Sequence, residues 1–229
     1  MNRDAKTQSA LVALARTRRL QRALAHAYIH RDAPIPTLRL SLGFMTSTAC
    51  TTDDCAARGH RMTLLGIARA EGVAYVVEEL GELDAPIAYR LWLAGPRQGH
   101  LVPIHAWYEQ CDDALAIRAR IAELAGTLEQ PARSTTEAWM LSTRVVQRRA
   151  LRVAGQASPI RKFALQLRVE PVSGVGPSGH TTVTAFLHPN AELAEVWALP
   201  DGACVARVTY TGIPSGLGLA KDTMVLLTE

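Results

Sequence analysis

Apolar residues alternate with polar ones through much of the second half of this chain, and this period-two pattern constrains the fold more than any other feature. The segment 163–169 carries an apolar residue at every second position, which is typical of a strand with one buried face. Two further runs, 196–199 and 204–210, flank Pro200-Asp201-Gly202, a strong tight-turn sequence. The pattern predicts antiparallel strands joined by short turns.

Helices are expected in the first and middle parts of the chain. The segment 113–129 follows Asp112, ends before Pro131, and has helical apolar spacing. Its apolar side is expected to pack on a sheet through Leu115, Ile117, Ile121, Leu124 and Leu128. The other expected helices are 7–31 and 62–70, and the other expected strands are 37–44, 73–80, 87–93, 100–108, 181–187 and 224–228.

The predicted fold class is therefore α+β, with antiparallel-rich sheets, an N-terminal helix and a central amphipathic helix. Residues 138–153 fit neither the helical nor the strand period cleanly. A chain of 229 residues suits a single domain over 1–229, or two lobes at 1–131 and 132–229.

Composition excludes several classes of protein. Hydrophobic residues make up 48% of the chain, which is too many for a wholly disordered protein. No run of about 18 apolar residues occurs, so no membrane-spanning helix is expected. The N-terminal sequence lacks an apolar signal core, and four cysteines do not make a disulfide scaffold in a chain of this length. A cytoplasmic location is the resulting expectation.

Charge is more informative by region than in total. The net charge is +4. Residues 1–31 hold seven basic residues and one acid, residues 133–168 hold eight and one, and residues 71–130 hold ten acids and four arginines. Two basic surfaces would suit a polyanion, because each neutralised phosphate releases counterions. Two alternatives would also explain the basic segments. They could form solvent-exposed faces whose charge balances that of the acidic segment within one fold, or they could reflect a compositional preference for arginine.

The predicted partner is a nucleic acid, with RNA favoured over DNA. Arginine makes planar, bidentate phosphate contacts and stacks on unpaired bases. The candidate RNA-binding residues are Arg18, Arg19 and Arg22 in the first helix, and Arg144, Arg148, Arg149, Arg152, Arg161 and Lys162 in the second basic segment.

Histidines near the end of the first helix are the candidate catalytic residues. His26 and His30 are one helical turn apart, with Tyr28 between them. Beside a phosphate, such imidazoles are placed for proton transfer. The same pair would also stabilise a helix C-terminus as cations, or bind a metal.

The spacing Cys50-x4-Cys55-x4-His60 resembles part of a zinc site, but no fourth ligand is close in sequence. Cys111 and His105 are the distant candidates. We therefore expect no metal. We also expect no cofactor, because the glycine-rich segment near the C-terminus has neither the Walker order nor a dinucleotide fingerprint.

That glycine-rich segment carries a family resemblance. Gly212, Gly216, Gly218 and Lys221 precede the apolar run Met224-Val225-Leu226-Leu227. Glycines followed by a lysine just before the last strand resemble the RAMP superfamily of CRISPR proteins, especially its repeat-processing endonucleases. The resemblance implies a ferredoxin-like βαββαβ fold and a loop that contacts RNA. It also implies metal-independent cleavage of a repeat hairpin by attack of a 2′-hydroxyl, with Arg144–Arg152 holding the stem.

Three functions follow as hypotheses. The first is an RNA-binding ribonuclease that cleaves a hairpin and retains it. The second is a non-catalytic nucleic-acid-binding subunit or regulator, such as a member of a larger ribonucleoprotein complex. The third is a small-molecule enzyme or protein-interaction domain in which the arginines have no specific partner.

Overall fold

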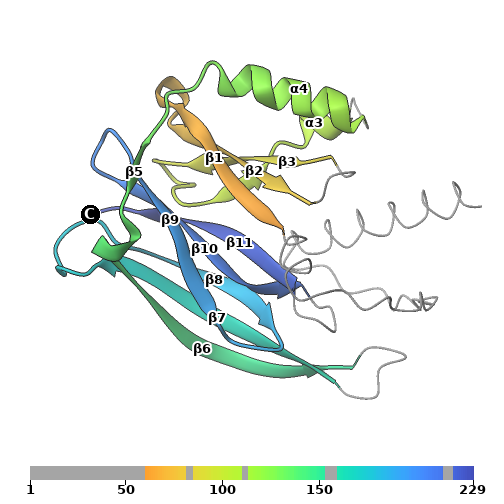
Figure 1. Cartoon of the computed structure of the whole chain (residues 1–229), viewed down its shortest axis with the longest axis vertical. Helices are drawn as coiled ribbons and strands as arrows, with labels where there is room; N and C mark the ends of the chain where they lie inside the picture. Colours follow the sequence, from red (N-terminus) through yellow and green to blue (C-terminus); the bar gives the residue numbers. More distant parts are fainter. Residues whose placement is uncertain (1–59, 81–84, 110–112, 153–158, 214–218) are drawn as a thin grey trace, which may run out of the picture. The chain divides into compact units, whose positions relative to one another are not determined.

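The computed structural model describes residues 60–80, 85–109, 113–152, 159–213 and 219–229 (Figure 1). All of them belong to the larger of the two compact units into which the chain divides, residues 45–229. The helix predicted at 7–31 and the strand predicted at 37–44 lie outside the described residues. The described strands are β1 (Arg61–Ala68), β2 (Val73–Glu79), β3 (Ile87–Trp92), β4 (Leu101–Pro103), β5 (Ala132–Ser134), β6 (Trp139–Leu151), β7 (Ile160–Pro171), β8 (Gly179–Phe186), β9 (Ala191–Ala198), β10 (Cys204–Ile213) and β11 (Leu219–Leu227), and the α-helices are α3 (Ala106–Glu109) and α4 (Ala114–Ala125).

The strands form three antiparallel sheets, which confirms the antiparallel-rich α+β prediction. The first sheet has the order β1-β2-β3-β4, the central sheet β11-β10-β9-β5, and the third sheet β6-β7-β8. Single bridges connect them. His60 pairs with Lys221 in parallel and so joins the start of β1 to β11, and Ser178 pairs with Thr228 just before β8.

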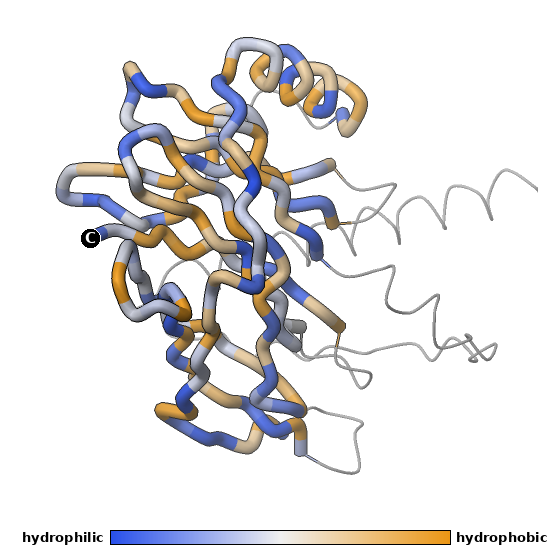
Figure 2. Tube along the Cα trace, turned by 60° about the vertical axis from the view of Figure 1, so that its left-hand side comes forward, coloured by the Kyte–Doolittle hydropathy of each residue, from blue (hydrophilic) through white to orange (hydrophobic). Residues whose placement is uncertain are grey.

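Three apolar clusters stack these sheets in layers. Alternate residues of β9–β11 point to opposite sides of the central sheet, as in any strand. One side packs against the third sheet, with Leu165 and Leu167 fully buried. The other side packs against the first sheet around Val76 and Leu91. The opposite face of the first sheet is covered by residues from α3 and α4. The alternation of hydrophobic and hydrophilic residues along the strands is visible in Figure 2.

The predicted strands of the C-terminal half are confirmed. The segment 163–169 lies within β7, and β9 and β10 form the hairpin predicted around Pro200-Asp201-Gly202. Residues 138–153, which matched neither period, contain the long strand β6. A bulge between Val145 and Gln147 interrupts its register. Because a bulge shifts the side-chain alternation by one residue, the strand period is broken in the middle of the segment.

The helix predicted at 62–70 is wrong, because these residues form β1 and a following 3-10 turn, Arg69–Glu71. A bulge between Leu64 and Gly66 breaks the period-two pattern there. Gly66 has φ +150°, and a Cβ at this position would lie 2.6 Å from the Cβ of Leu128. The bulge and the close approach both require glycine, and together they hid the strand from sequence analysis.

The strand predicted at 100–108 is correct only for its first part. The residues Leu101–Pro103 form β4, and α3 follows at Ala106. Pro103 has no N–H to donate to a sheet. The chain turns after it, and the backbone N of Ile104 donates to the carbonyl of Ala88 at 2.9 Å.

The central helix is confirmed, but one of its predicted packing residues is wrong. The helix α4 begins after Asp113, whose side chain accepts a hydrogen bond from the backbone N of Leu115. Leu115 itself is 75% exposed, whereas Ile117 is 1% exposed. Ile117, Ile121 and Leu124 follow the spacing of one helix face, and Leu115 falls outside it. Within the described part of the chain, neither this helix nor any other is long and apolar enough to cross a membrane.

Candidate functional site

A buried carboxylate on β2 gathers three polar side chains from three other segments. The side chain of Glu78 is 2% exposed. Its Oε1 lies 3.0 Å from Nδ1 of His60 and 3.2 Å from Nζ of Lys221. Its Oε2 accepts a hydrogen bond from the hydroxyl of Tyr89 on β3. We call these four residues the Glu78 centre.

The Glu78 centre keeps its carboxylate ionised. Burial by itself raises the pKa of Glu78, since a charge is costly in a poorly solvated place. The hydrogen bonds from His60 and Tyr89 and the positive charge of Lys221 outweigh burial and lower the pKa from the usual 4.5 to about 2. Glu78 is therefore an anion at neutral pH, with donors on both oxygens.

Tyr89 is held in its protonated form. Burial raises the pKa of Tyr89, and the nearby negative charge of Glu78 raises it further. The phenol consequently acts as a hydrogen-bond donor to Glu78 throughout the physiological range. Its role in this geometry is to fix the carboxylate.

His60 has the environment of a general base. The carboxylate of Glu78 accepts from Nδ1, so a neutral imidazole carries its proton on Nδ1 and its lone pair on Nε2. In catalytic triads, a buried carboxylate makes the same contact with Nδ1 of the histidine and holds the imidazole in the tautomer that accepts a proton on Nε2. The side chain of His60 is 31% exposed, as is that of Lys221. Both can therefore be reached from solvent while Glu78 cannot.

Backbone pairing holds His60 and Lys221 next to each other. The N–H of His60 donates to the carbonyl of Ala220 at 3.1 Å, and the N–H of Asp222 donates to the carbonyl of His60 at 3.0 Å. These two bonds form the parallel bridge between His60 and Lys221. The relative position of the imidazole and the ammonium group is thus set by the main chain.

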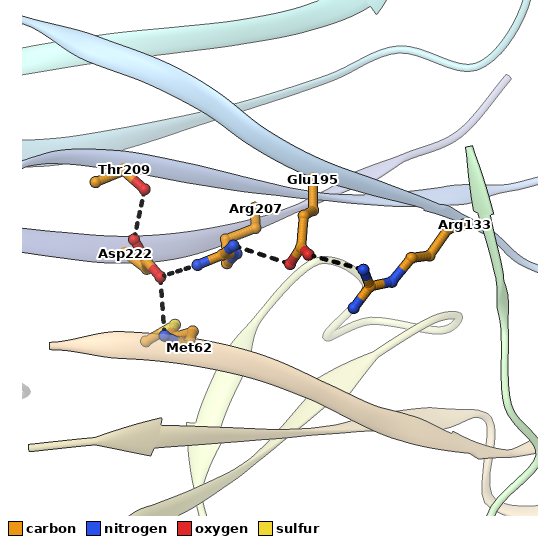
Figure 3. A network of polar contacts seen from close by, with 6 residues as sticks. All are labelled: Met62, Arg133, Glu195, Arg207, Thr209 and Asp222. Carbon is orange, nitrogen blue, oxygen red and sulfur yellow. Dashed lines mark hydrogen bonds and ion pairs between the residues drawn. The ribbon is translucent and has the colours of Figure 1, made fainter. Parts of the chain in front are cut away.

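A buried ionic network next to this bridge fixes the same two strands (Figure 3). Oδ2 of Asp222 accepts from the backbone N of Met62 on β1 at 2.9 Å and from Nη1 of Arg207 at 2.8 Å. Thr209 donates its hydroxyl to Oδ1 of Asp222 at 2.7 Å. Nη2 of Arg207 continues the network to Glu195 on β9, 2.9 Å away.

The network ends at the surface. Arg133 on β5 lies 3.4 Å from Oε1 of Glu195, and its side chain is 75% exposed, whereas that of Arg207 is 10% exposed. Figure 3 shows the side chains of Arg207, Glu195 and Arg133 in a row that crosses three strands. The paired charges of Arg207 and Asp222 connect β10 and β11 to the start of β1, which carries the residues next to His60.

The family resemblance places Gly212 in a loop that contacts RNA, and its described surroundings indicate close packing. A Cβ at Gly212 would lie 2.6 Å from the Cβ of Lys221 and 2.7 Å from the ring of Tyr210. Glycine at this position therefore makes room for Lys221. Its contact with RNA stays a prediction. Gly216 and Gly218 lie outside the described residues.

Much of the second basic segment forms a charged face on the third sheet. On β7 the residues Leu165 and Leu167 point into the core, so Lys162 and Arg168 point to the opposite face. Arg149 pairs with Lys162 across the ladder, and Arg144 pairs with Gln166. We call Arg144, Arg149, Lys162 and Arg168 the outer basic face. The three strands of this sheet carry six Arg or Lys residues and a single Glu.

Two of the predicted arginines do not belong to the outer basic face. Arg148 pairs with Phe163, and Arg161 pairs with Ala150, so both lie on the core side of the ladder although both are exposed. Adjacent residues of a strand point to opposite faces, which separates Arg148 from Arg149. Arg152 follows the end of β6 and is exposed.

The remaining predicted site residues lie outside the described part of the chain. They are Arg18, Arg19, Arg22, His26, Tyr28 and His30. Cys50, Cys55 and Cys111 also lie outside it. Among the described residues no group of His, Cys, Asp and Glu could hold a metal ion, and His60 directs Nδ1 to Glu78.

Sequence analysis missed Glu78 and Tyr89 as site residues and considered His60 only as a zinc ligand. One local feature could have identified Glu78: it follows the apolar run Val73–Val77 in a strand buried on both faces. An acidic side chain at such a position is costly unless it is paired. Nothing in the local sequence relates it to Tyr89 or Lys221.

The function of this chain has to be inferred from its side chains, because no similarity to a known protein indicates one. The strands of the first and central sheets bring together an oriented histidine, a lysine and a buried carboxylate, and the third sheet adds a basic face. No family model, no curated protein and no solved structure matches this chain.

Proposed function

We propose that this protein binds RNA and cleaves it without a metal ion, with His60 of the Glu78 centre as the proton-transferring residue. The observation that carries the proposal is the 3.0 Å contact between Nδ1 of His60 and the buried carboxylate of Glu78, with Nζ of Lys221 beside it. In phosphodiester transfer, an oriented imidazole can take up a proton and an ammonium group can stabilise the negative charge that develops on the phosphate.

The step involves the RNA, these side chains and a water molecule. Nε2 of His60 takes the proton of a 2′-hydroxyl, and the 2′-oxygen forms a bond to the adjacent phosphorus. The bond from phosphorus to the 5′-oxygen breaks on the opposite side, that oxygen takes a proton from a water molecule, and the protonated His60 returns its proton to the resulting hydroxide. The products are a 2′,3′-cyclic phosphate and a 5′-hydroxyl, and no water is consumed. Lys221 stabilises the negative charge of the phosphorane.

The outer basic face supports the RNA-binding half of the proposal. Its cations lie on a sheet whose opposite side is the protein core. They are exposed or partly exposed, and in the described part of the chain their ion pair is the one between Arg168 and Glu170 on β7, at 2.8 Å. Such a surface can hold the phosphates of a structured RNA while the reaction takes place elsewhere.

The second candidate is a non-catalytic nucleic-acid-binding subunit or regulator. The outer basic face favours it, since that face needs no reaction to be useful. Three further expectations are compatible with both candidates and stay proposals: a place in a larger ribonucleoprotein complex, a cytoplasmic location and a ferredoxin-like fold. The described order of elements does not by itself contain a βαββαβ unit.

Incubation of the purified chain with a labelled hairpin RNA in EDTA tests the proposal. We expect cleavage and salt-sensitive binding, with log affinity falling linearly against log salt. Arg149→Ala/Lys162→Ala should reduce the salt slope by roughly one to two, whereas the matched variant Arg148→Ala/Arg161→Ala changes it less. Retention without cleavage would support the non-catalytic candidate. If RNA binding is absent or independent of salt, both candidates are wrong.

A further inference from the structure

The outer basic face contains a hollow of about 520 Å³ at one end. Its lining includes Ser142, Arg144, Gln166, Arg168, Ser178 and His180. No acidic residue lines it among those that the structure describes. Its volume falls within the range of small-ligand sites, about 300–1,000 Å³, but its walls are polar and basic. The chemistry of the lining therefore points to an anion.

The pairing of the strands brings three basic side chains around this hollow. Arg168 on β7 pairs with Ser142 on one side and with His180 on the other. Arg144 pairs with Gln166 one row further along the same face. Directly paired and diagonal positions lie within about 8 Å of each other. Two guanidinium groups and an imidazole can thus reach one phosphate group, with hydroxyl and amide groups beside them.

Ion pairing of these cations is weak in the described part of the chain. Among the described residues, their ion pair is the one between Nη2 of Arg168 and Glu170, at 2.8 Å. Side chains of Arg168 and Glu170 are 60% and 25% exposed, so this ion pair is of the weak surface kind. Among the described residues, Arg144 and His180 have no carboxylate partner.

The surroundings of the hollow define a direction along the sheet. The neighbouring row on one side carries Met140 and Glu170, which offers a phosphate no attraction. On the other side, Lys162 and its partner Arg149 form another basic row. Lys162 is six residues from Arg168 along β7, which corresponds to roughly 20 Å at about 3.3–3.4 Å per residue. Along β7, the hollow therefore holds the last cations of the outer basic face on this side.

We propose that this hollow binds a terminal phosphate monoester of an RNA chain, whose body extends toward Arg149 and Lys162. This inference rests on the proposed RNA binding and makes it specific. A monoester carries close to two negative charges at neutral pH, more than a backbone diester. Two guanidinium groups match it, because each can donate two parallel hydrogen bonds to phosphate oxygens.

The test compares three versions of one hairpin with 2′-O-methyl riboses, which lack the attacking hydroxyl. One has a 5′-phosphate, one a 3′-phosphate, and one hydroxyl groups at both ends. Fluorescence anisotropy at fixed salt should show about tenfold tighter binding of a phosphorylated form than of the hydroxyl form. The two phosphorylated arms identify which end is recognised.

Variants separate this site from general electrostatics. Arg144→Ala/Arg168→Ala should abolish the preference for a phosphorylated end. Arg148→Ala/Arg161→Ala removes the same charge from the other face of the ladder and should retain the preference. Equal affinity for all three hairpins, with salt-sensitive binding preserved, would overturn the terminal-phosphate site and leave the proposed function standing. Absence of binding to any hairpin would overturn both.

Discussion

Lys221 and His60 are joined twice, once through their main chains and once through a shared carboxylate oxygen. The backbone bridge aligns β11 with the start of β1, and Oε1 of Glu78 lies 3.2 Å from Nζ of Lys221 and 3.0 Å from Nδ1 of His60. The backbone bridge fixes the relative position of the two residues in the main chain. The contacts with Oε1 of Glu78 fix the direction of their side chains. The imidazole and the ammonium group are therefore held side by side at one buried carboxylate.

The depressed pKa of Glu78 makes stability depend on acid pH. Since the pKa is about 2 in the folded chain and usually 4.5, the unfolded chain binds the proton more readily. The stabilisation is complete above pH 4.5 and is lost as the pH falls from about 4.5 to about 2. Its size is on the order of 3 kcal/mol, at about 1.4 kcal/mol per pKa unit.

Urea unfolding between pH 2 and pH 7 checks this dependence. In Glu78→Gln the contribution in that range should be missing, and the free energy of unfolding at pH 7 should be lower by about 2–4 kcal/mol. The matched variant Glu79→Gln removes a partly exposed partner of Arg118 and should cost less than about 1 kcal/mol. An unchanged acid profile in Glu78→Gln would contradict the pairing.

Asp222→Ala should be among the most destabilising single changes in the central sheet. It leaves the buried guanidinium of Arg207 without its closest partner and the backbone N of Met62 without an acceptor. The expected loss is about 3–5 kcal/mol in urea unfolding. Thr209→Val removes only the hydroxyl that donates to Asp222 and should cost about 1 kcal/mol. Equal effects of the two variants would show that the ionic part of the network contributes nothing.

Gly212→Ala should disturb Lys221 through packing alone. The added methyl group would lie 2.6 Å from the Cβ of Lys221 and 2.7 Å from the ring of Tyr210, so a loss of about 1–3 kcal/mol is expected. In Gly126→Ala the nearest heavy atom is 3.4 Å away and the backbone is helical, so that variant should be neutral or slightly stabilising. Thermal melts of both variants measure the difference, and a neutral Gly212→Ala would argue against the close packing.

The two faces of α4 should respond differently to truncation. Ile117 is 1% exposed, and Ile117→Ala should cost about 2–5 kcal/mol. Leu115 is 75% exposed, and Leu115→Ala should change stability by less than about 0.5 kcal/mol. Chemical denaturation of the two variants distinguishes the faces. A larger loss for Leu115→Ala would reverse the assignment.

Local periodicity was sufficient where strands are regular. It located β7, the β9–β10 hairpin and the central helix, because the alternation of their side chains is visible within a few residues. It failed at β1, where the bulge before Gly66 interrupts the alternation, and it was undecided at β6 for the same reason. Without a strand assignment for β6, the opposite directions of Arg148 and Arg149 were hidden as well.

The candidate site was harder to predict than the fold because its residues meet only through tertiary pairing. Glu78 stands out as an acid after an apolar run, but His60 is eighteen positions before it and Lys221 lies near the C-terminus. Local spacing assigned His60 to a zinc pattern and Lys221 to a glycine-rich loop. The parallel bridge between β1 and β11 brings them together, and no short-range pattern encodes a bridge of that kind.

The rate of RNA cleavage by His60→Ala in EDTA tests the central claim most directly. The wild-type chain should cut a hairpin RNA to a 2′,3′-cyclic phosphate and a 5′-hydroxyl, and His60→Ala should be slower by about 10²–10⁴-fold while its RNA affinity is unchanged. His188→Ala replaces an exposed histidine after β8 and should cleave at the wild-type rate. Cleavage by His60→Ala at the wild-type rate would contradict the assignment of His60 as the proton-transferring residue.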